Sequence, residues 1–207
     1  NLGDKVREDS LAGGGKDTVI STINYSLLDT DGLGLNDTLG GGVENLTLAS
    51  TLLGGAAAFN ATGNALNNTI IGNENNNIID GGAGLSTSVS GGLDTMTGGD
   101  GNDTYLVDDV GDLIKELAPS MIIVAGAQLP STVGNADGIY ATLGDGKTFN
   151  MSTNALNVEI LHILDNTDTV VGANDNVNVI GNASDNIIWG GKGNNNIDGG
   201  LGNDIIT

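Results

Sequence analysis

The stretch of sequence that decides the fold is Gly98-Gly99-Asp100-Gly101-Asn102-Asp103-Thr104-Tyr105-Leu106. It fits the template G-G-x-G-x-D-x-U-x, in which U is a large apolar residue, at every specified position. Residues 199–207 fit as well, and counting back in nines from the two copies finds further units from residues 54 and 172 onward. An insertion at residues 85–92 interrupts one unit. The apolar position recurs as Ile70, Ile79, Met96, Tyr105, Val179, Ile188, Ile197 and Ile206.

Each unit combines a six-residue turn with a three-residue extended segment. Glycine suits such turns because it adopts positive φ and lets backbones approach closely. Side chains alternate along the extended segment, so position eight faces inward and its neighbours face outward. Two units make an eighteen-residue coil, and stacked coils form two parallel sheets over a thin aliphatic core. The predicted fold is therefore all-β, a right-handed parallel β-roll or β-helix solenoid with an irregular β connecting segment.

This pattern divides the chain into four parts. Residues 1–53 form a linker with lead-in rungs, because apolar residues alternate over 17–27 and recur at Val43, Leu46 and Leu48. Residues 54–107 form the first roll, and residues 172–207 form a second roll that is truncated at the chain end. Residues 108–171 connect them, with a small core of their own and a predicted hairpin at residues 144–147. Segments of this chain also resemble one another at separations above 100 residues, so we expect it to be a piece of a longer tandem protein.

Composition excludes several classes of protein. Aromatic residues make up 3% of the chain and cysteine is absent, so a ring-rich globular core, disulfides and zinc–sulfur sites are excluded. The net charge of −20 makes nucleic acid and anionic membranes poor partners, and no apolar run is long enough to span a bilayer. Asp, Asn and Gly supply the oxygen ligands and tight turns that calcium needs, although a solvated acidic surface remains an alternative.

The nonapeptides resemble the RTX, or hemolysin-type, calcium-binding β-roll of secreted proteins. In that family Ca²⁺ is the bound ion, held between a turn and the turn one full coil later by position-six Asp carboxylates and backbone carbonyls. The candidate metal-binding residues that the resemblance implies are Gly81, Gly82, Ala83, Gly84, Asp94, Gly98, Gly99, Asp100, Gly101, Asp103, Gly199, Gly200, Gly202 and Asp204. The carboxylate of Asp100 itself is expected to face outward, as are those of Asp80 and Asp198.

Position six departs from the family pattern in several units. Its residues are Asn68, Asn77, Asp94 and Asp103 in the first array and Val177, Asn186, Asn195 and Asp204 in the second. Stacking alternate units predicts that Asn68 faces Asp94, that Asn77 faces Asp103 and that Asn186 faces Asp204, so that no pair contains two carboxylates. We therefore expect weak calcium sites, with affinities of about 10⁻⁴ to 10⁻³ M. Asparagine ladders in which amides bond to one another are the alternative for the Asn positions.

No catalytic constellation is present in the sequence. The single histidine, His162, lies in an apolar stretch, and the recurring glycine turns do not open helices as phosphate loops do. We expect a non-enzymatic, calcium-binding structural or adhesive module of a large secreted bacterial surface protein, ordered by extracellular calcium and able to self-associate into fibres or a surface layer. The alternative is a non-catalytic export and folding region of a secreted protease, lipase or polysaccharide epimerase. Binding of surface glycans is a third hypothesis, but the regular outward Thr row expected of a flat binding face is missing.

Overall fold

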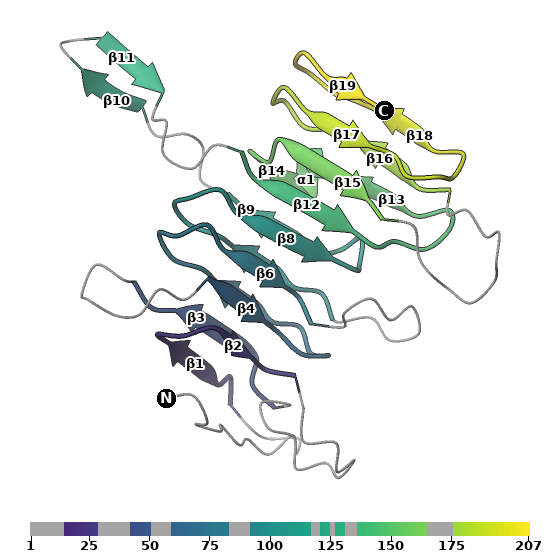
Figure 1. Ribbon diagram of the computed structural model, residues 1–207. Helices are drawn as coiled ribbons and strands as arrows, with labels where there is room; N and C mark the ends of the chain where they lie inside the picture. Colours follow the sequence, from purple (N-terminus) through teal and green to yellow (C-terminus); the bar gives the residue numbers. More distant parts are fainter. Residues whose placement is uncertain are drawn as a thin grey trace.

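The computed structural model describes residues 15–28, 42–50, 59–82, 92–116, 136–164 and 176–207, with the backbone alone at 121–124 and 127–130. The described chain winds into a stack of β coils whose strands run in parallel (Figure 1). One sheet has the order β1 (Thr18–Ser21), β3 (Asn45–Leu48), β5 (Thr69–Ile71), β7 (Thr95–Thr97), β9 (Leu113–Lys115), β14 (Ala155–Leu156). This is the parallel β-roll that the nine-residue period predicts.

A second sheet takes the alternate strands. Its order is β19 (Ile205–Ile206), β17 (Ile187–Trp189), β15 (Ile160–Ile163), β12 (Gly138–Ala141), β8 (Thr104–Val107), β6 (Ile78–Asp80), β4 (Asn60–Thr62), β2 (Tyr25–Ser26). At the C-terminal end a three-stranded sheet faces it, formed by β13 (Thr148–Asn150), β16 (Asn178–Ile180) and β18 (Asn196–Asp198). The helix α1 (Met151–Asn154) is a single turn. No helix among the described residues has the length and apolar character to cross a membrane.

The strand register shows the coil period directly. Asn178 pairs with Asn196 and Thr95 with Leu113, in each case eighteen residues apart. Thr69 pairs with Thr95 instead, which is one coil plus the eight-residue insertion. Residues 83–91, which hold most of that insertion together with Ala83 and Gly84, lie outside the described residues.

The core is the column of position-eight side chains. Ile70, Ile79, Met96 and Tyr105 are fully buried, and Val179 and Ile188 continue the column. Ile197 is partly buried, and Ile206, on the last strand of its sheet, is 46% exposed. The lead-in residues extend the same core, because β1 pairs with β3, β3 pairs with β5, and Val19, Leu46 and Leu48 are buried.

Much of the segment expected to connect two rolls is itself solenoid. β12 pairs in parallel with both β8 and β15, so the large sheet runs without a break past residue 107. Residues 144–147 do form a tight turn, in which the Lys147 amide donates to the Gly144 carbonyl. The predicted hairpin there is wrong, however, since β12 and β13 on its two sides belong to different sheets. The antiparallel hairpin is instead β10 (Met121–Val124) with β11 (Ala127–Pro130).

Candidate metal centres

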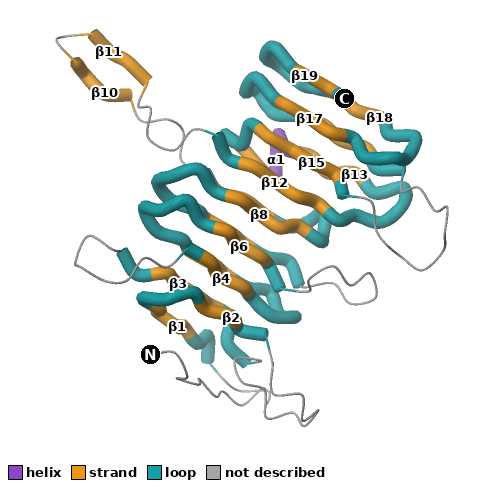
Figure 2. The backbone as a smooth tube through the Cα atoms, viewed as in Figure 1, coloured by secondary structure: helices purple, strands orange, loops and turns teal. Residues whose placement is uncertain are grey.

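The turns lie at both ends of the strands and stack from coil to coil (Figure 2). Their position-six side chains connect one coil to the next. Asp94 Oδ1 accepts the backbone N–H of Asn68 at 2.7 Å, and Asp103 Oδ1 accepts that of Asn77 at 2.7 Å. Asp204 Oδ1 accepts the N–H of Asn186 at 2.9 Å. Each of these pairs is the one that the stacking of alternate units predicts.

The same ladder continues beyond the nonapeptides. Asp94 donates its own N–H to Asp112 Oδ1 at 3.0 Å, and Asp103 donates to Asp137 Oδ1 at 2.8 Å. The expectation that no stacked pair contains two carboxylates is therefore wrong. The pairs with two carboxylates lie on the far side of Asp94 and Asp103, towards coils that do not match the nine-residue template.

These contacts assemble two groups of three acids, which we call cluster 1 and cluster 2. Cluster 1 consists of Asp94, Asp108 and Asp112, and cluster 2 of Asp103, Glu116 and Asp137. Within each group one carboxylate oxygen per residue lies within 4.8 Å of the others. Carboxylate oxygens at this spacing are the ligands that Ca²⁺ prefers. Within the part of the chain that the structure describes, no such group forms around Asp204.

Burial makes these charges costly without a cation. Asp94, Asp103, Asp112 and Asp137 are each at most 3% exposed. Desolvation, reinforced by neighbouring carboxylates, raises the pKa of Asp94 to about 8, of Asp103 to about 7 and of Asp112 to about 6. Backbone N–H donors oppose the shift in every case. A divalent cation between the carboxylates would offset the desolvation and the mutual repulsion that raise these pKa values.

Two buried oxygens point to such a cation. Asp94 Oδ2 and Asp103 Oδ2 have no hydrogen-bond partner, although the other oxygen of each side chain accepts a backbone N–H. A buried acceptor without a donor is rare in proteins and costs free energy. The donor sets of clusters 1 and 2 therefore fit calcium, which would give these two oxygens the partner that they lack.

The glycines of the turns are needed for this close packing. A Cβ at Gly81 would collide with Asp94 Oδ2, and a Cβ at Gly98 would collide with Asp103 Oδ2. Gly99 has a φ of +113°, and a Cβ there would lie 2.7 Å from the carbonyl oxygen of Asn73 in the preceding coil. Positive φ recurs in the turns at Gly82, Gly101, Gly200 and Gly202, and a Cβ at Gly199 would meet Asp204 Oδ2.

The asparagine turns are built differently, because they present donors. Asn68 Nδ2 donates to the carbonyl oxygens of Val43 and Glu44 at 3.2 Å each, and Asn64 Nδ2 donates to Val43 at 2.8 Å. The turn at residues 181–186 repeats this arrangement towards Ala155 and Val158. These cross-coil bonds run to backbone carbonyls and so differ from the ladder of amides bonded to one another that the sequence offers as an alternative. The amide N–H₂ groups here donate hydrogen bonds to the carbonyl oxygens of the neighbouring coil.

Two of the candidate acids join neither cluster. They are Asp100, which lies in the turn before Asp103, and Asp204. At another position six, Asn195 Oδ1 accepts the N–H of Val177 at 2.9 Å, so this coil contact carries no charge. Sequence reasoning missed Asp108, Asp112, Glu116 and Asp137. Signals existed for two of them: Asp112 follows Asp94 by eighteen residues, and Asp137 stands two residues before Ile139, as position six stands before position eight.

Cluster 2 is also tied to the core. The hydroxyl of Tyr105, a fully buried position-eight residue, donates to Glu116 Oε1. Asp137 in turn donates its N–H to Glu159 Oε2 at 3.2 Å, and burial raises the pKa of Glu159. The cluster therefore joins the coils of β8, β9, β12 and β15.

One family of sequences matches this chain. The RTX calcium-binding nonapeptide repeat matches in 4 copies, at residues 62–84, 89–114 and 165–206. No curated protein and no solved structure matches the chain significantly. The matched segments contain all three acids of cluster 1, whereas Glu116 and Asp137 of cluster 2 lie outside them.

Proposed function

Because this chain carries RTX calcium-binding nonapeptide repeats, we propose that it is a calcium-ordered structural module of a large secreted bacterial surface protein. The observation that carries the proposal is a pair of three-acid clusters, each with two buried acids, in which Asp94 and Asp103 each have an unpartnered oxygen. The repeats bind calcium, and cluster 2 adds the carboxylates of Glu116 and Asp137 from outside the matched segments.

The physical basis is the coupling of metal binding to folding. A chain with a net charge of −20 repels itself, and gathering six carboxylates in two groups, four of them buried, adds to that cost. Metal-binding free energy becomes folding free energy when the unfolded chain lacks the site. Secretion therefore takes the chain from low calcium, where its folding is disfavoured, to millimolar calcium, where the coils close.

We extend the proposal to assembly into fibres or a surface layer. In the sheet order β19 ends one sheet and β18 another, so each has a neighbouring strand on one side only. A parallel edge of this kind accepts a further coil, either from the same chain or from another molecule. Self-association at this edge would give an adhesive or layer-forming protein its length.

The alternative function is that of an export and folding region attached to a secreted enzyme such as a protease, lipase or polysaccharide epimerase. In both functions these residues contribute calcium-dependent folding and no catalysis. A catalytic domain encoded beside these repeats would favour the alternative, whereas further tandem copies of the repeats would favour the surface protein.

The deciding experiment is circular dichroism and sedimentation in calcium and then in chelator. We expect more β structure and a higher melting temperature in millimolar calcium than in chelator, and species larger than a monomer as calcium rises. A spectrum unchanged by chelator would refute calcium-driven folding, and monomers that persist in millimolar calcium would refute fibre assembly. Asp103→Ala should weaken calcium binding more than Asp100→Ala, and the reverse order would show that the assignment of the turns is wrong.

A further inference from the structure

A row of large side chains crosses the outer face of the eight-stranded sheet. The parallel register places Leu106 beside Tyr140, Tyr140 beside His162, and His162 beside Trp189. Ring centroids are 5.5 Å apart between Tyr140 and His162 and 5.4 Å apart between His162 and Trp189, with the ring planes tilted by about 40°. The four residues form a continuous surface across β8, β12, β15 and β17, which we call the aromatic row.

Packing in the hydrophobic core does not account for the aromatic row. Tyr140 is 41% exposed and Trp189 37% exposed, whereas Tyr105 and Phe149 are buried. The chain has six aromatic residues in 207, and two of them stand in this row beside the only histidine. Exposed aromatic side chains gathered in line on a rigid sheet are characteristic of binding surfaces.

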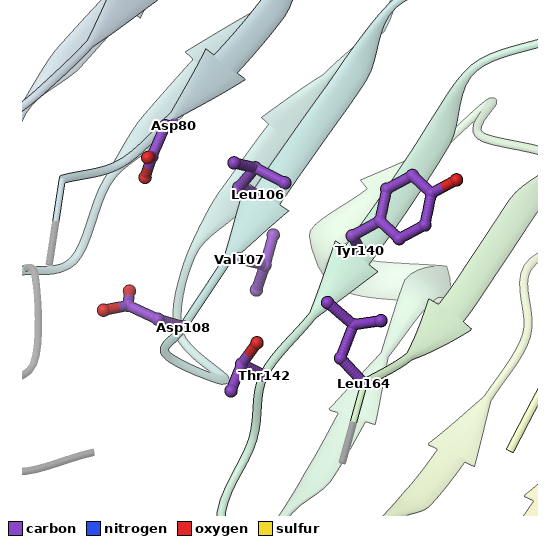
Figure 3. Close-up of a pocket in the computed structure, with 7 residues that line it drawn as sticks. All are labelled: Asp80, Leu106, Val107, Asp108, Tyr140, Thr142 and Leu164. Carbon is purple, nitrogen blue, oxygen red and sulfur yellow. The ribbon is translucent and has the colours of Figure 1, made fainter. Parts of the chain in front are cut away.

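A pocket adjoins the row at Tyr140 (Figure 3). Its walls are formed by Asp80, Leu106, Val107, Asp108, Tyr140, Thr142 and Leu164. In Figure 3 the carboxylates of Asp80 and Asp108 lie on one side, and the Tyr140 ring and Leu164 lie on the other. The pocket thus offers an apolar surface opposite two hydrogen-bond acceptors.

We propose that the pocket and the aromatic row together bind an oligosaccharide of neutral or amino sugars. A sugar ring has apolar C–H faces, which pack on aromatic rings, and hydroxyls at its edge, which donate to carboxylates. One ring occupies the pocket, with its hydroxyls towards Asp80 and Asp108, and the following rings lie along Tyr140, His162 and Trp189. Neighbouring strands are about 4.8 Å apart, so the row offers successive stacking positions to an extended chain.

The charge of the protein selects the class of sugar. A net charge of −20 and the carboxylate of Asp80, which belongs to neither cluster, repel uronic acids and sulfated sugars at the pocket. Neutral sugars are tolerated, and a protonated amino group is attracted. This inference goes beyond calcium-dependent folding, because it concerns a surface of the folded coils, and it revises the expectation that a glycan-binding face would need an outward Thr row.

The test uses the intrinsic fluorescence of Trp189, the single tryptophan of the chain. The full chain in millimolar calcium is titrated with tetramers of β-1,4-linked glucose and of β-1,4-linked glucosamine, with tetragalacturonate as the acidic control. We expect a saturable change in fluorescence with the first two sugars and none with the third. Calorimetry should show binding to weaken at least tenfold in Tyr140→Ala and in Trp189→Ala.

Phe59→Ala is the matched control, since Phe59 is 44% exposed and lies outside the row. Circular dichroism in calcium shows whether each variant keeps its fold, which separates lost binding from lost calcium-driven folding. The proposal is overturned if neither the glucose tetramer nor the glucosamine tetramer gives a saturable signal. It is also overturned if Phe59→Ala weakens binding as much as Tyr140→Ala and Trp189→Ala do. Sedimentation that shows the row holding two copies of the chain together, with Tyr140→Ala releasing monomers, would overturn it in favour of an interface between copies.

Discussion

The substitution Asp112→Asn tests whether cluster 1 binds calcium. Asp112 supplies one of three carboxylates, and its Oδ1 accepts the N–H of Asp94 at 3.0 Å. An asparagine keeps that coil contact and nearly the same side-chain volume while removing the charge, but it loses the Oδ2 acceptor of the Asp108 and Asp109 N–H groups. A change in the calcium response that has no counterpart in chelator therefore reports on the charge.

The magnitude follows from linkage between binding and folding. A site with a dissociation constant of about 10⁻⁴ M stabilises the fold by about 2.7 kcal/mol at about 10 mM calcium. If the lost charge weakens the site about a hundredfold, that stabilisation falls to about 0.4 kcal/mol. The difference of about 2.3 kcal/mol corresponds to about 5–9 °C in the melting temperature of a domain of this size.

The calcium-free protein should respond less than the calcium-bound protein. At pH 7.5 most of the Asp112 carboxyl is ionised, because burial raises its pKa only to about 6. Replacing it by an amide removes a desolvation cost but also removes the acceptor of the Asp108 and Asp109 N–H groups, so the two effects oppose each other in the calcium-free fold. Thermal melts by circular dichroism, with calcium and with chelator, measure both effects.

Asp100→Asn is the matched control, because it removes the same charge from a carboxylate outside both clusters. It should keep the calcium-induced rise in melting temperature of the unsubstituted protein. Equal losses in Asp100→Asn and Asp112→Asn would show that net charge alone sets the response. An unchanged response in Asp112→Asn would refute cluster 1 as a calcium site.

Three further predictions concern the fold and its protonation. In chelator, stability should fall as pH rises from about 4 to about 8. The reason is that buried carboxyls such as that of Asp94, whose pKa is raised to about 8, bind protons more tightly in the folded state than in the unfolded state. Thermal melts at pH 5 and pH 8 check this, and a higher melting temperature at pH 8 would contradict it. Gly99→Ala should destabilise the calcium-bound fold by about 1–3 kcal/mol, whereas Gly144→Ala, with open space at its Cβ, should be nearly neutral in denaturant titrations. Ile79→Ala should destabilise the fold by about 2–5 kcal/mol, because Ile79 is fully buried. The neighbouring Ile78 is 45% exposed, so Ile78→Ala should cost under about 0.5 kcal/mol. Similar losses in the two variants would show that the inward and outward faces are misassigned.

Much of the fold was predictable because the nine-residue period has a direct physical meaning. Position eight faces inward in every unit, so the buried column from Ile70 to Ile188 could be named from the spacing alone. The pairing of Asn68 with Asp94 also follows from it, once the eight-residue insertion is subtracted. Periodicity predicts contacts between coils whenever both coils keep the period.

Prediction failed where the period is lost. Asp137 pairs with Asp103 across 34 residues, because the β10–β11 hairpin and its flanks intervene. Only a partial signal marks residues 136–141 as the next rung, because Asp137 and Ile139 keep the spacing of positions six and eight but the paired glycines of the template are missing before them. No sequence pattern marks Glu116 as a ligand. It lies near Asp103 because it directly follows β9.

The positions of the two clusters explain why acids gather at this interruption of the repeat. Asp94 and Asp112 of cluster 1 directly precede β7 and β9, whereas Asp103 and Asp137 of cluster 2 directly precede β8 and β12. The two clusters therefore lie in the turns on opposite sides of one coil. Closing a longer loop adds only about 0.6 kcal/mol for each doubling of its length. The larger problem is specificity, because after the hairpin no repeated turn selects which strand pairs with β8. A cation held by Asp103 and Asp137 would make that choice, because both carboxylates come together only when β12 lies beside β8. Calcium would then join coils where the repeated sequence no longer does, whereas the asparagine turns join theirs through side-chain hydrogen bonds.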